Sequence, residues 1–543
     1  MTISRGALVA ALMSCVSAAA LTAPASAQQT PRDTFVMAMA IDAINTLDPG
    51  RIGDAVGDEI INNVCDPIVA LDTSTDAKVV PGLAESWTVS EDGMTITFKL
   101  RDVKHPSGNP VTASDAVWTF NRTLAINTIN AGTLREYGLG QDRAAEAFTA
   151  PDARTLVVKL NKPYPTNFIL ANIFATRAAF ILDKNEMAKH YKVGEDPFMR
   201  GDEKSPGWLN TNSACAGPYK LRSWAFNDSI IYERNENYWR GAPHMRRVIV
   251  KHLNEAGAQF LQLKAGDIDA ARNLNPEGLE GVLNDKNLKL ASAVRQTMQY
   301  ATFNTLDKAF AHPKVRLAFR YLIDYDALQK TVMRHEGIAR ASLVPLEAFG
   351  ALDEKAGQPF KLDLDKAKQL ITEAGFPNGF EKEFLFTPNF PNPEIAQHIQ
   401  ANAAKIGIKL NLQTMAGAQL FPKMRQRGFE MAMLNWNVVP ADGHAFVSRL
   451  AMNPDNSPNL PPSNMASWWS AYFDPKVNEM GEKALFERDE AKRAALYHEI
   501  QRHQMENGPH AFMFQIKRNV GMRASIKEFK FTGNRAYYRT VQK

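Results

Sequence analysis

Polar and apolar residues alternate along residues 95–101, which run Thr-Ile-Thr-Phe-Lys-Leu-Arg. A strand with one buried face has this period of two. Beyond the break at residues 108–110, Thr112 stands three residues before Asp115, so its hydroxyl and that carboxylate can cap the amides of a new helix. The segment predicts a strand, a turn and a helix whose buried stripe is Val117, Phe120 and Leu124.

Similar patterns alternate along the rest of the chain, without an internal repeat or a low-complexity linker. Such alternation is typical of a mixed α/β protein. Short apolar runs predict strands, and apolar residues at helical spacing, often ended by glycine or proline, predict helices. The predicted strands are 229–232 and 248–250, and the predicted helices are 256–264, 314–333, 365–374 and 486–505.

Length and composition point to a large soluble protein. The chain has 543 residues, well beyond the roughly 250–300 at which a single core stops growing, so two or more lobes are expected. Hydrophobic residues make up 45% and charged residues 22%, which is ordinary for a globular chain. The net charge of +5 is small and scattered, so we expect no nucleic-acid partner.

The N-terminus has the pattern of a secretory signal peptide. Arg5 precedes an apolar run from Gly6 to Leu21, and Ala25-Ser26-Ala27 is a cleavage site of the A-x-A type. We expect residues 1–27 to be removed and the mature chain to start at Gln28 in the periplasm. A membrane anchor is disfavoured because the run is shorter than the ~20 residues of a spanning helix. Acylation at Cys15 is the other alternative, but its flanking residues match poorly.

Loss of the signal peptide leaves two cysteines, Cys65 and Cys215. Two thiols in an exported protein can form a disulfide bond. They can also remain separate buried thiols, which behave as small apolar residues. The sequence leaves both possibilities open.

Sequence patterns of enzymes and metal sites are missing. The chain contains neither G-x-S-x-G nor G-x-x-x-x-G-K-[ST]. His498-Glu499 meets its next histidine at His503, one step beyond the spacing of a zinc protease helix. No C-x-x-C pair is present for structural zinc. We therefore expect no catalytic residues, no metal and no cofactor.

Residues 81–122, PGLAESWTVSEDGMTITFKLRDVKHPSGNPVTASDAVWTFNR, closely resemble the hallmark of the family 5 extracellular solute-binding proteins. These proteins are the dipeptide, oligopeptide and nickel receptors of ABC importers. Further segments resemble family patterns in the family's order: Leu47-Asp48-Pro49, Ala216–Leu221, Glu233–Trp239, Lys264–Asp269, Tyr300–Asn304 and Lys366–Gly379.

The resemblance implies an α/β, bilobed periplasmic-binding-protein fold with an extra subdomain inserted in lobe I. Lobe I would comprise residues 28–300, with the insertion at about 70–210, and lobe II residues 301–514. Residues 515–543 would return to lobe I. The chain would cross between the lobes near Tyr300 and near residues 512–515.

The implied function is that of a periplasmic receptor, a monomer that captures peptides or peptide-like solutes by lobe closure. Its partner would be an inner-membrane ABC permease. Two alternatives stay open. The solute can be a non-peptide, such as an opine, an oligosaccharide or a metal chelate, or the chain can be an exported chaperone-like or signalling binding protein.

Residues 429–442 resemble the family's ligand-binding region around Trp436. In peptide-binding members, the first acid after that tryptophan holds the ligand's α-amino group. Here that position is Val439, and only the second acid is retained, as Asp442. Either Asp442 takes over the amine, or the ligand has no free amine at this point. The ring of Trp436 offers a stacking surface.

Other candidates follow from the same resemblance. Arg425 lies where some relatives carry a carboxylate-binding arginine, whereas Arg427 before Gly428 fits a solvated helix end better. The expected ligand-binding set is Ile44, Asn45, Thr46, Tyr300, Arg425, Trp436, Asn437, Val439 and Asp442.

Overall fold

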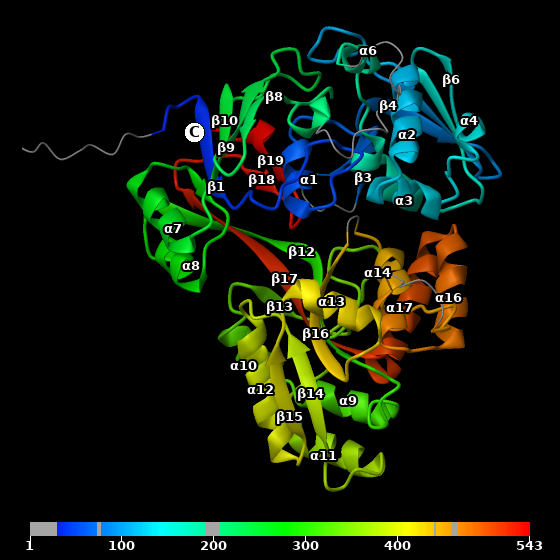
Figure 1. Ribbon diagram of the computed structural model, residues 1–543, viewed down its shortest axis with the longest axis vertical. Coiled ribbons are helices and arrows are strands. Elements are labelled where there is room, and N and C mark those ends of the chain that lie inside the picture. The colour runs from blue at the N-terminus through cyan, green and yellow to red at the C-terminus, as the bar shows by residue number, and fades with distance from the viewer. Residues whose placement is uncertain (1–29, 73–77, 191–206, 439–440, 459–464) are drawn as a thin grey trace, which may run out of the picture.

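The computed structural model describes residues 30–72, 78–190, 207–438, 441–458 and 465–543, and it has two lobes (Figure 1). Lobe I, in blue, cyan and green, lies above lobe II, in green, yellow and orange. Two long strands, β12 (Leu288–Phe303) and β17 (His510–Arg523), run through both lobes. This bilobed α/β architecture confirms the predicted fold class.

One sheet extends through both lobes in the order β15-β14-β16-β12-β17-β11-β1-β10-β9-β8, and β13 also pairs with β17. β12 and β17 are antiparallel, and their register is interrupted between Val294 and Met298. β16 pairs with β12 from Thr297 to Phe303, a stretch that begins within this break. The other strands are β1 (Thr34–Met39), β8 (Tyr219–Ala225), β9 (Ser229–Arg234), β10 (Arg247–His252), β11 (Ala270–Ala271), β13 (Gly337–Ala339), β14 (Glu381–Phe386), β15 (Lys409–Thr414) and β16 (Met431–Asn437).

A second, four-stranded sheet within lobe I has its own core. The helix that packs on it, α2, begins as predicted. Asp115 N–H donates to Thr112 Oγ1 at 3.2 Å, and Thr112 N–H donates to Asp115 Oδ2 at 2.9 Å. The rings of Phe120 and Phe148 stack at 4.4 Å between helix and sheet. These elements are β4 (Ala84–Val89), β5 (Thr95–Leu100), β6 (Phe148–Asp152), β7 (Thr155–Lys159), α2 (Ala113–Ile126) and α3 (Ile129–Glu136).

Cys65 and Cys215 form a disulfide bond with Cα atoms 4.8 Å apart. Both cysteines are buried in the main core of lobe I. The bond closes a loop across a sequence separation of 150 residues, which restricts the unfolded chain. Of the two alternatives, the structure confirms the disulfide.

The remaining elements of lobe I frame these two sheets. They are β2 (Val69–Leu71), β3 (Val79–Pro81), β18 (Lys530–Phe531), β19 (Ala536–Tyr537), α1 (Ala55–Ile61), α4 (Ala144–Ala147), α5 (Thr166–Ile169), α6 (Lys184–Ala188), α7 (Ala256–Ala265), α8 (Pro276–Leu283), η1 (Leu170–Phe174), η2 (Arg177–Ala179), η3 (Trp208–Asn210) and η4 (Tyr538–Thr540).

Lobe II has two apolar cores, one on each side of its part of the sheet. Its helices are α9 (Pro313–Tyr321), α10 (Tyr325–Lys330), α11 (Leu364–Glu373), α12 (Asn392–Lys405), α13 (Gly417–Arg425), α14 (Gly443–Leu450), α15 (Ala466–Trp469), α16 (Pro475–Phe486) and α17 (Glu490–Asn507).

Two predicted helices differ from the observed ones. The single helix expected at 314–333 is broken into α9 and α10, because the Asp324 carboxylate accepts from the Ala327 amide and starts a new helix. The apolar spacing continues across the break, which hid it from the sequence pattern. Similarly, α17 begins after its cap Asp489, so Phe486 belongs to the preceding helix. In the described part of the chain, no helix is long and apolar enough to cross a bilayer.

Candidate interlobe solute site

A cavity of about 270 Å³ lies between the two lobes. Its wall on the side of lobe II is Asn437, at the end of β16, and the other lining residues belong to lobe I. They come from the start of α1, from α3, from η1 and η2, and from the loop after β18. The lobe I lining consists of Gly53, Asp54, Ala55, Asp58, Asn130, Thr133, Asn172, Thr176, Arg177, Asn534 and Arg535.

One charged group in this lining is neutralised by its neighbours. The Asp58 carboxylate accepts from Arg177 Nη1 at 2.9 Å and lies 3.6 Å from Arg535 Nε. Burial would raise the pKa of Asp58, but the charges of Arg535 and Arg177 outweigh it and hold the pKa below its usual value. Asp58 therefore organises the wall and is not available for a ligand charge.

Asp54 is the other carboxylate in the lining. It caps α1 by accepting from the Gly57 amide at 2.6 Å. Within the described residues it has no ion-pair partner, and the residue is partly exposed. A carboxylate held in place by a helix cap and open to a cavity can accept hydrogen bonds from an ammonium group.

Side-chain amides provide most of the neutral polar surface of the cavity. Asn130 is fixed, since it donates to two backbone carbonyls and accepts from Arg177 Nε. Asn437 accepts from Thr297 Oγ1 at 2.7 Å. In Asn534, both polar side-chain atoms are buried without a hydrogen-bond partner in the described residues. A buried amide of this kind needs a partner with both a donor and an acceptor.

An aromatic group lies beside Asn437 in lobe II. Trp436 is half-buried, and its ring centroid is 5.6 Å from that of Trp469. Phe421 of α13 packs 6.3 Å from Trp469 and keeps 37% of its surface exposed. Trp436 packs against the core on the opposite face of β16 from Asn437, and neither Trp436 nor Phe421 is among the residues that line the cavity.

Asp442, which is one of the two alternatives for the ligand amine, is engaged by protein groups in this structure. Asp442 is 6% exposed and caps α14 by accepting from the His444 amide at 2.8 Å. Its carboxylate also accepts from Arg493 Nη1 at 2.9 Å and Nη2 at 2.8 Å. The carboxylate is thus paired already, by an arginine 51 residues away that the local sequence pattern does not reveal.

Two other predicted contacts are core residues. Ile44 is fully buried in the main core of lobe I. Tyr300 is also fully buried, with its ring 4.9 Å from His510 and 5.3 Å from Phe512. Neither side chain is among the residues that line the interlobe cavity.

The other predicted residues differ in exposure and in their contacts. Asn45 is exposed, and Thr46 hydrogen-bonds Asn210. Arg425, the last residue of α13, is half-buried. Arg427 holds Asn456 at 2.8 Å and stacks 4.0 Å over Trp468, so it is a structural residue. Val439 lies outside the described residues.

The lobes touch along one edge. Arg449 of α14 donates to both carboxylate oxygens of Glu136 of α3 at 2.8 Å, and Figure 1 shows α3 directly above α14. The ring of Phe168 packs 5.6 Å from His444 and 5.1 Å from the Arg493 guanidinium. The structure is therefore one in which the two lobes are in contact.

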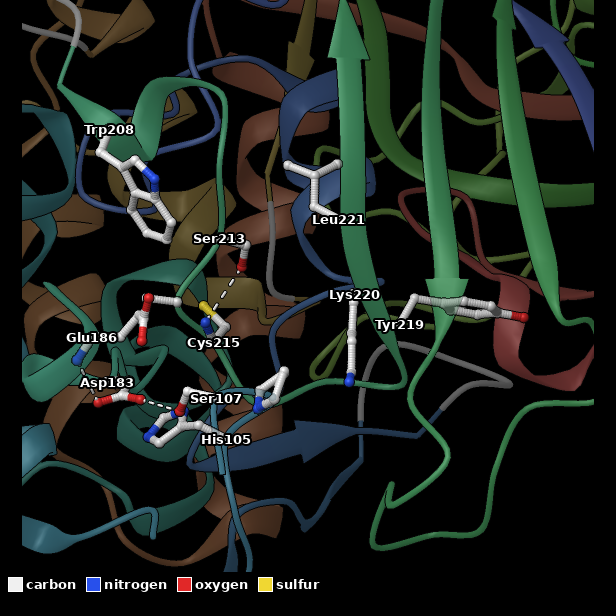
Figure 2. Close-up of a pocket in the computed structure, with 12 residues that line it drawn as sticks. His105, Ser107, Asp183, Glu186, Trp208, Ser213, Cys215, Tyr219, Lys220 and Leu221 are labelled. Atoms are coloured by element: carbon white, nitrogen blue, oxygen red, sulfur yellow. Dashed lines mark hydrogen bonds between the residues drawn. The ribbon is translucent and has the colours of Figure 1, made fainter. Parts of the chain in front are cut away.

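A second pocket, of about 240 Å³, lies within lobe I beside the disulfide (Figure 2). His105, Asp183 and Trp208 are among its lining residues, and Figure 2 shows the hydrogen bond that Ser107 donates to Asp183. Burial lowers the pKa of His105, against the charges of Asp183 and Asp115. Because lobe II contributes no lining residue, lobe closure cannot enclose a ligand there.

Known proteins resemble this chain over most of its length. It is 29% identical to Heme-binding protein A of Haemophilus influenzae, over 79% of this chain and 77% of that protein. It is 26% identical to the Probable D,D-dipeptide-binding periplasmic protein DdpA of Escherichia coli, over 94% and 93% of the two chains. The solved structure of HbpA2 from Haemophilus parasuis superimposes with a TM-score of 0.78 at 25% identity, covering 94% of this chain and 99% of that one.

The family model for the middle region of the bacterial extracellular solute-binding proteins, family 5, matches residues 78–458. The matched region includes the inserted sheet, β12 and the cavity residues from Asn130 to Asn437, but not those of α1 or of the loop after β18. This is a family of solute-binding proteins. The chain belongs to the bacterial extracellular solute-binding proteins of family 5.

Proposed function

We propose that this chain is the periplasmic receptor of an ABC importer and that it captures a peptide or peptide-like solute between its lobes. The observation that carries the proposal is the polar cavity closed by lobe I on one side and by Asn437 of lobe II on the other. Closure of two lobes around a solute removes water and strengthens each polar contact.

The cavity chemistry favours a solute with amide groups. Asn534 offers one donor and one acceptor without partners in the described residues, and a peptide unit matches both. Asp54 supplies a carboxylate for a terminal ammonium in place of the acid that is replaced by Val439. Trp436 and Phe421 keep partly exposed rings outside the cavity lining, and these would be available to apolar side chains of a longer solute. The dipeptide-binding name of one relative agrees with this class.

We also propose how the chain is exported, its oligomeric state, the limits of its lobes and the position of its hinge. Residues 1–27 are a signal peptide cleaved after Ala27, and the mature receptor is a monomer. Lobe I comprises residues 28–300 and 515–543, with the subdomain inserted at about 70–210, and lobe II comprises 301–514. The break in register between Val294 and Met298 supports a hinge at this level of β12.

A non-peptide solute is the second candidate. The position that binds the amine in peptide receptors is Val439, and Asp442 is committed to Arg493. A relative named for heme binding shows that similar chains are named for other solutes. In this case the aromatic surface of lobe II, and not Asp54, would provide the main contact.

Deletion of the receptor tests the transport function. A strain without this chain should lose growth on dipeptides or tripeptides as nitrogen source, and the intact chain should restore it. Unchanged peptide uptake in the deletion strain, together with no calorimetric binding of peptides to the purified protein, would contradict a peptide receptor.

The variant Asp54→Asn tests the amine site. Loss of the carboxylate should weaken binding of a peptide with a free amine by about 2–5 kcal/mol, because the ammonium remains without its partner. N-acetylated peptides should be affected little. Asp42→Asn, at an exposed position, is the matched control and should bind like the wild type. Equal losses for free and acetylated peptides would contradict an ammonium contact at Asp54.

A further inference from the structure

A cluster in lobe I, here called the arginine cluster, contains the buried residues Glu59 and Arg518 and the partly exposed residues Arg272 and Arg295. Glu59 of α1 is fully buried. Its Oε2 lies 3.1 Å from Arg272 Nη1 and also accepts from Arg518 Nη2. Arg295 stands at the break in the β12 register, two residues beyond Ala293, which pairs with Arg518. Arg272 and Arg518 contact the Glu59 carboxylate, and Arg295 interacts with it electrostatically, so three guanidinium groups share one carboxylate, a formal charge of +2.

The hydrogen-bonding capacity of this cluster is not filled. Arg518 is 5% exposed, yet its Nε and Nη1 have no partner in the described residues, and neither does Nε of Arg295. The other oxygen of Glu59 accepts from Tyr538 Oη at 3.3 Å, and the unpartnered Nε and Nη1 groups of Arg518 do not reach this carboxylate. Burial, together with the charge of Arg518, lowers the pKa values of Arg272 and Arg295 to about 10. Positive charge is therefore in excess over negative charge at this place.

The arginine cluster adjoins the interlobe cavity through two segments. Glu59 follows Asp58 on α1, and Asp58 lines the cavity. On the other side, Gly533 packs so closely on the Arg295 backbone that an added Cβ would lie 2.3 Å from its Cα. The next two residues, Asn534 and Arg535, also line the cavity. The cluster thus lies next to the cavity and at the level where β12 passes between the lobes.

A buried, uncompensated positive charge is costly, and an unsatisfied guanidinium N–H adds to that cost. An oxyanion removes both costs at once. The planar fork of a guanidinium donates two parallel hydrogen bonds to a carboxylate, or to two oxygens of a sulfate or phosphate group. A neutral ligand group would leave the excess charge in place.

We propose that the arginine cluster binds an oxyanion group of the transported solute, a carboxylate in a peptide-like solute, through Arg295 and Arg518. This inference rests on the proposed receptor function and specifies the solute as one that carries a negative charge. Because Arg295 lies at the register break of β12, the bound anion contacts the strand that connects the lobes. Binding of the charged group and lobe closure are thereby linked.

Anion titrations of the purified mature chain test the site. Acetate, succinate and sulfate are each exchanged for chloride at constant ionic strength, and the unfolding temperature and tryptophan fluorescence are recorded. The wild type should show saturable stabilisation by at least one oxyanion. In Arg295→Gln the apparent dissociation constant should rise about tenfold or more, since one of two charged donors is lost. The control Arg222→Gln, at an exposed position on β8, should match the wild type.

The unfolding temperature measured without an oxyanion distinguishes an arginine that binds the ligand from one that stabilises the fold. Removal of one positive charge relieves repulsion, so Arg295→Gln should unfold at the same or a higher temperature than the wild type in chloride alone. Stabilisation by acetate or succinate but not by sulfate identifies a carboxylate site. Stabilisation by sulfate alone identifies a site for a tetrahedral oxyanion. No saturable response in the wild type, or equal responses in wild type and Arg295→Gln, overturns the proposal. Peptide uptake that depends on the chain would then leave the receptor function intact.

Discussion

Two buried pairings of acid and arginine differ in their stoichiometry. In lobe II, one carboxylate pairs with one guanidinium, since Asp442 accepts hydrogen bonds from both terminal nitrogens of Arg493, at 2.9 and 2.8 Å. In lobe I, Glu59 pairs with Arg272 and Arg518, Arg295 adds a third positive charge nearby, and several N–H groups have no hydrogen-bond partner in the described residues. The balanced pair is complete without a ligand, whereas the unbalanced cluster needs one. Proximity of charged residues alone therefore does not identify a site.

The largest effect is expected from breaking the balanced pair. Asp442→Asn leaves Arg493 charged and buried, so the free energy of unfolding should fall by about 3–5 kcal/mol. Chemical denaturation measures this loss. The double variant Asp442→Asn, Arg493→Met should recover part of the stability, because the uncompensated charge is gone. A loss of ligand affinity without loss of stability would contradict the structural role of Asp442.

Acid should weaken the contact between the lobes through His444. Burial, with the nearby charges of Arg493 and Arg449, lowers the pKa of His444 to about 3. The unfolded chain therefore binds a proton that the folded chain excludes, and stability falls as pH falls from about 6.5 towards 3. His444→Gln should show a shallower decline over this range in denaturation curves. His510, with a pKa also lowered to about 3, remains as an internal reference. Identical pH profiles for variant and wild type would contradict the assignment.

The smallest effect is expected at the exposed contact of Arg449 with Glu136. Both side chains are partly solvated, at 33% and 41% exposure, so the pair contributes about 0–1 kcal/mol. Arg449→Ala should therefore raise the solute dissociation rate a few-fold at most, measured by stopped-flow fluorescence. Lys476→Ala removes a comparable pair within lobe II and should leave that rate unchanged. An effect of equal size in both variants would show that the contact plays no part in closure.

Local structure was largely predictable because it depends on neighbouring residues. The capping box at Thr112 and Asp115 appears as expected, and the helix expected at 256–264 is observed as α7, which ends at the left-handed Gly266. The disulfide needed three-dimensional information, because sequence does not give the distance between Cα atoms. The break at Asp324 was missed because its apolar spacing continues on both sides.

The candidate site was less predictable, because its parts come from distant segments. The role of Asp442 depends on Arg493, and the arginine cluster joins α1, the residue after β11, β12 and β17. Tyr300 was predicted at the cleft from its place in a family pattern, but its ring lies in the core of lobe II. One signal was present in the sequence. Arg295 and Arg518 interrupt strands in which buried residues are otherwise mostly apolar or neutral.

The most direct test of the unbalanced cluster is a crystal structure of the mature chain grown with succinate. The account predicts a carboxylate within hydrogen-bond distance of Arg518 Nη1 and the Arg295 guanidinium, next to the cavity lined by Asn534 and Asp58. A structure in which succinate lies elsewhere, or in which Arg295 and Arg518 bond only to protein groups, would contradict it.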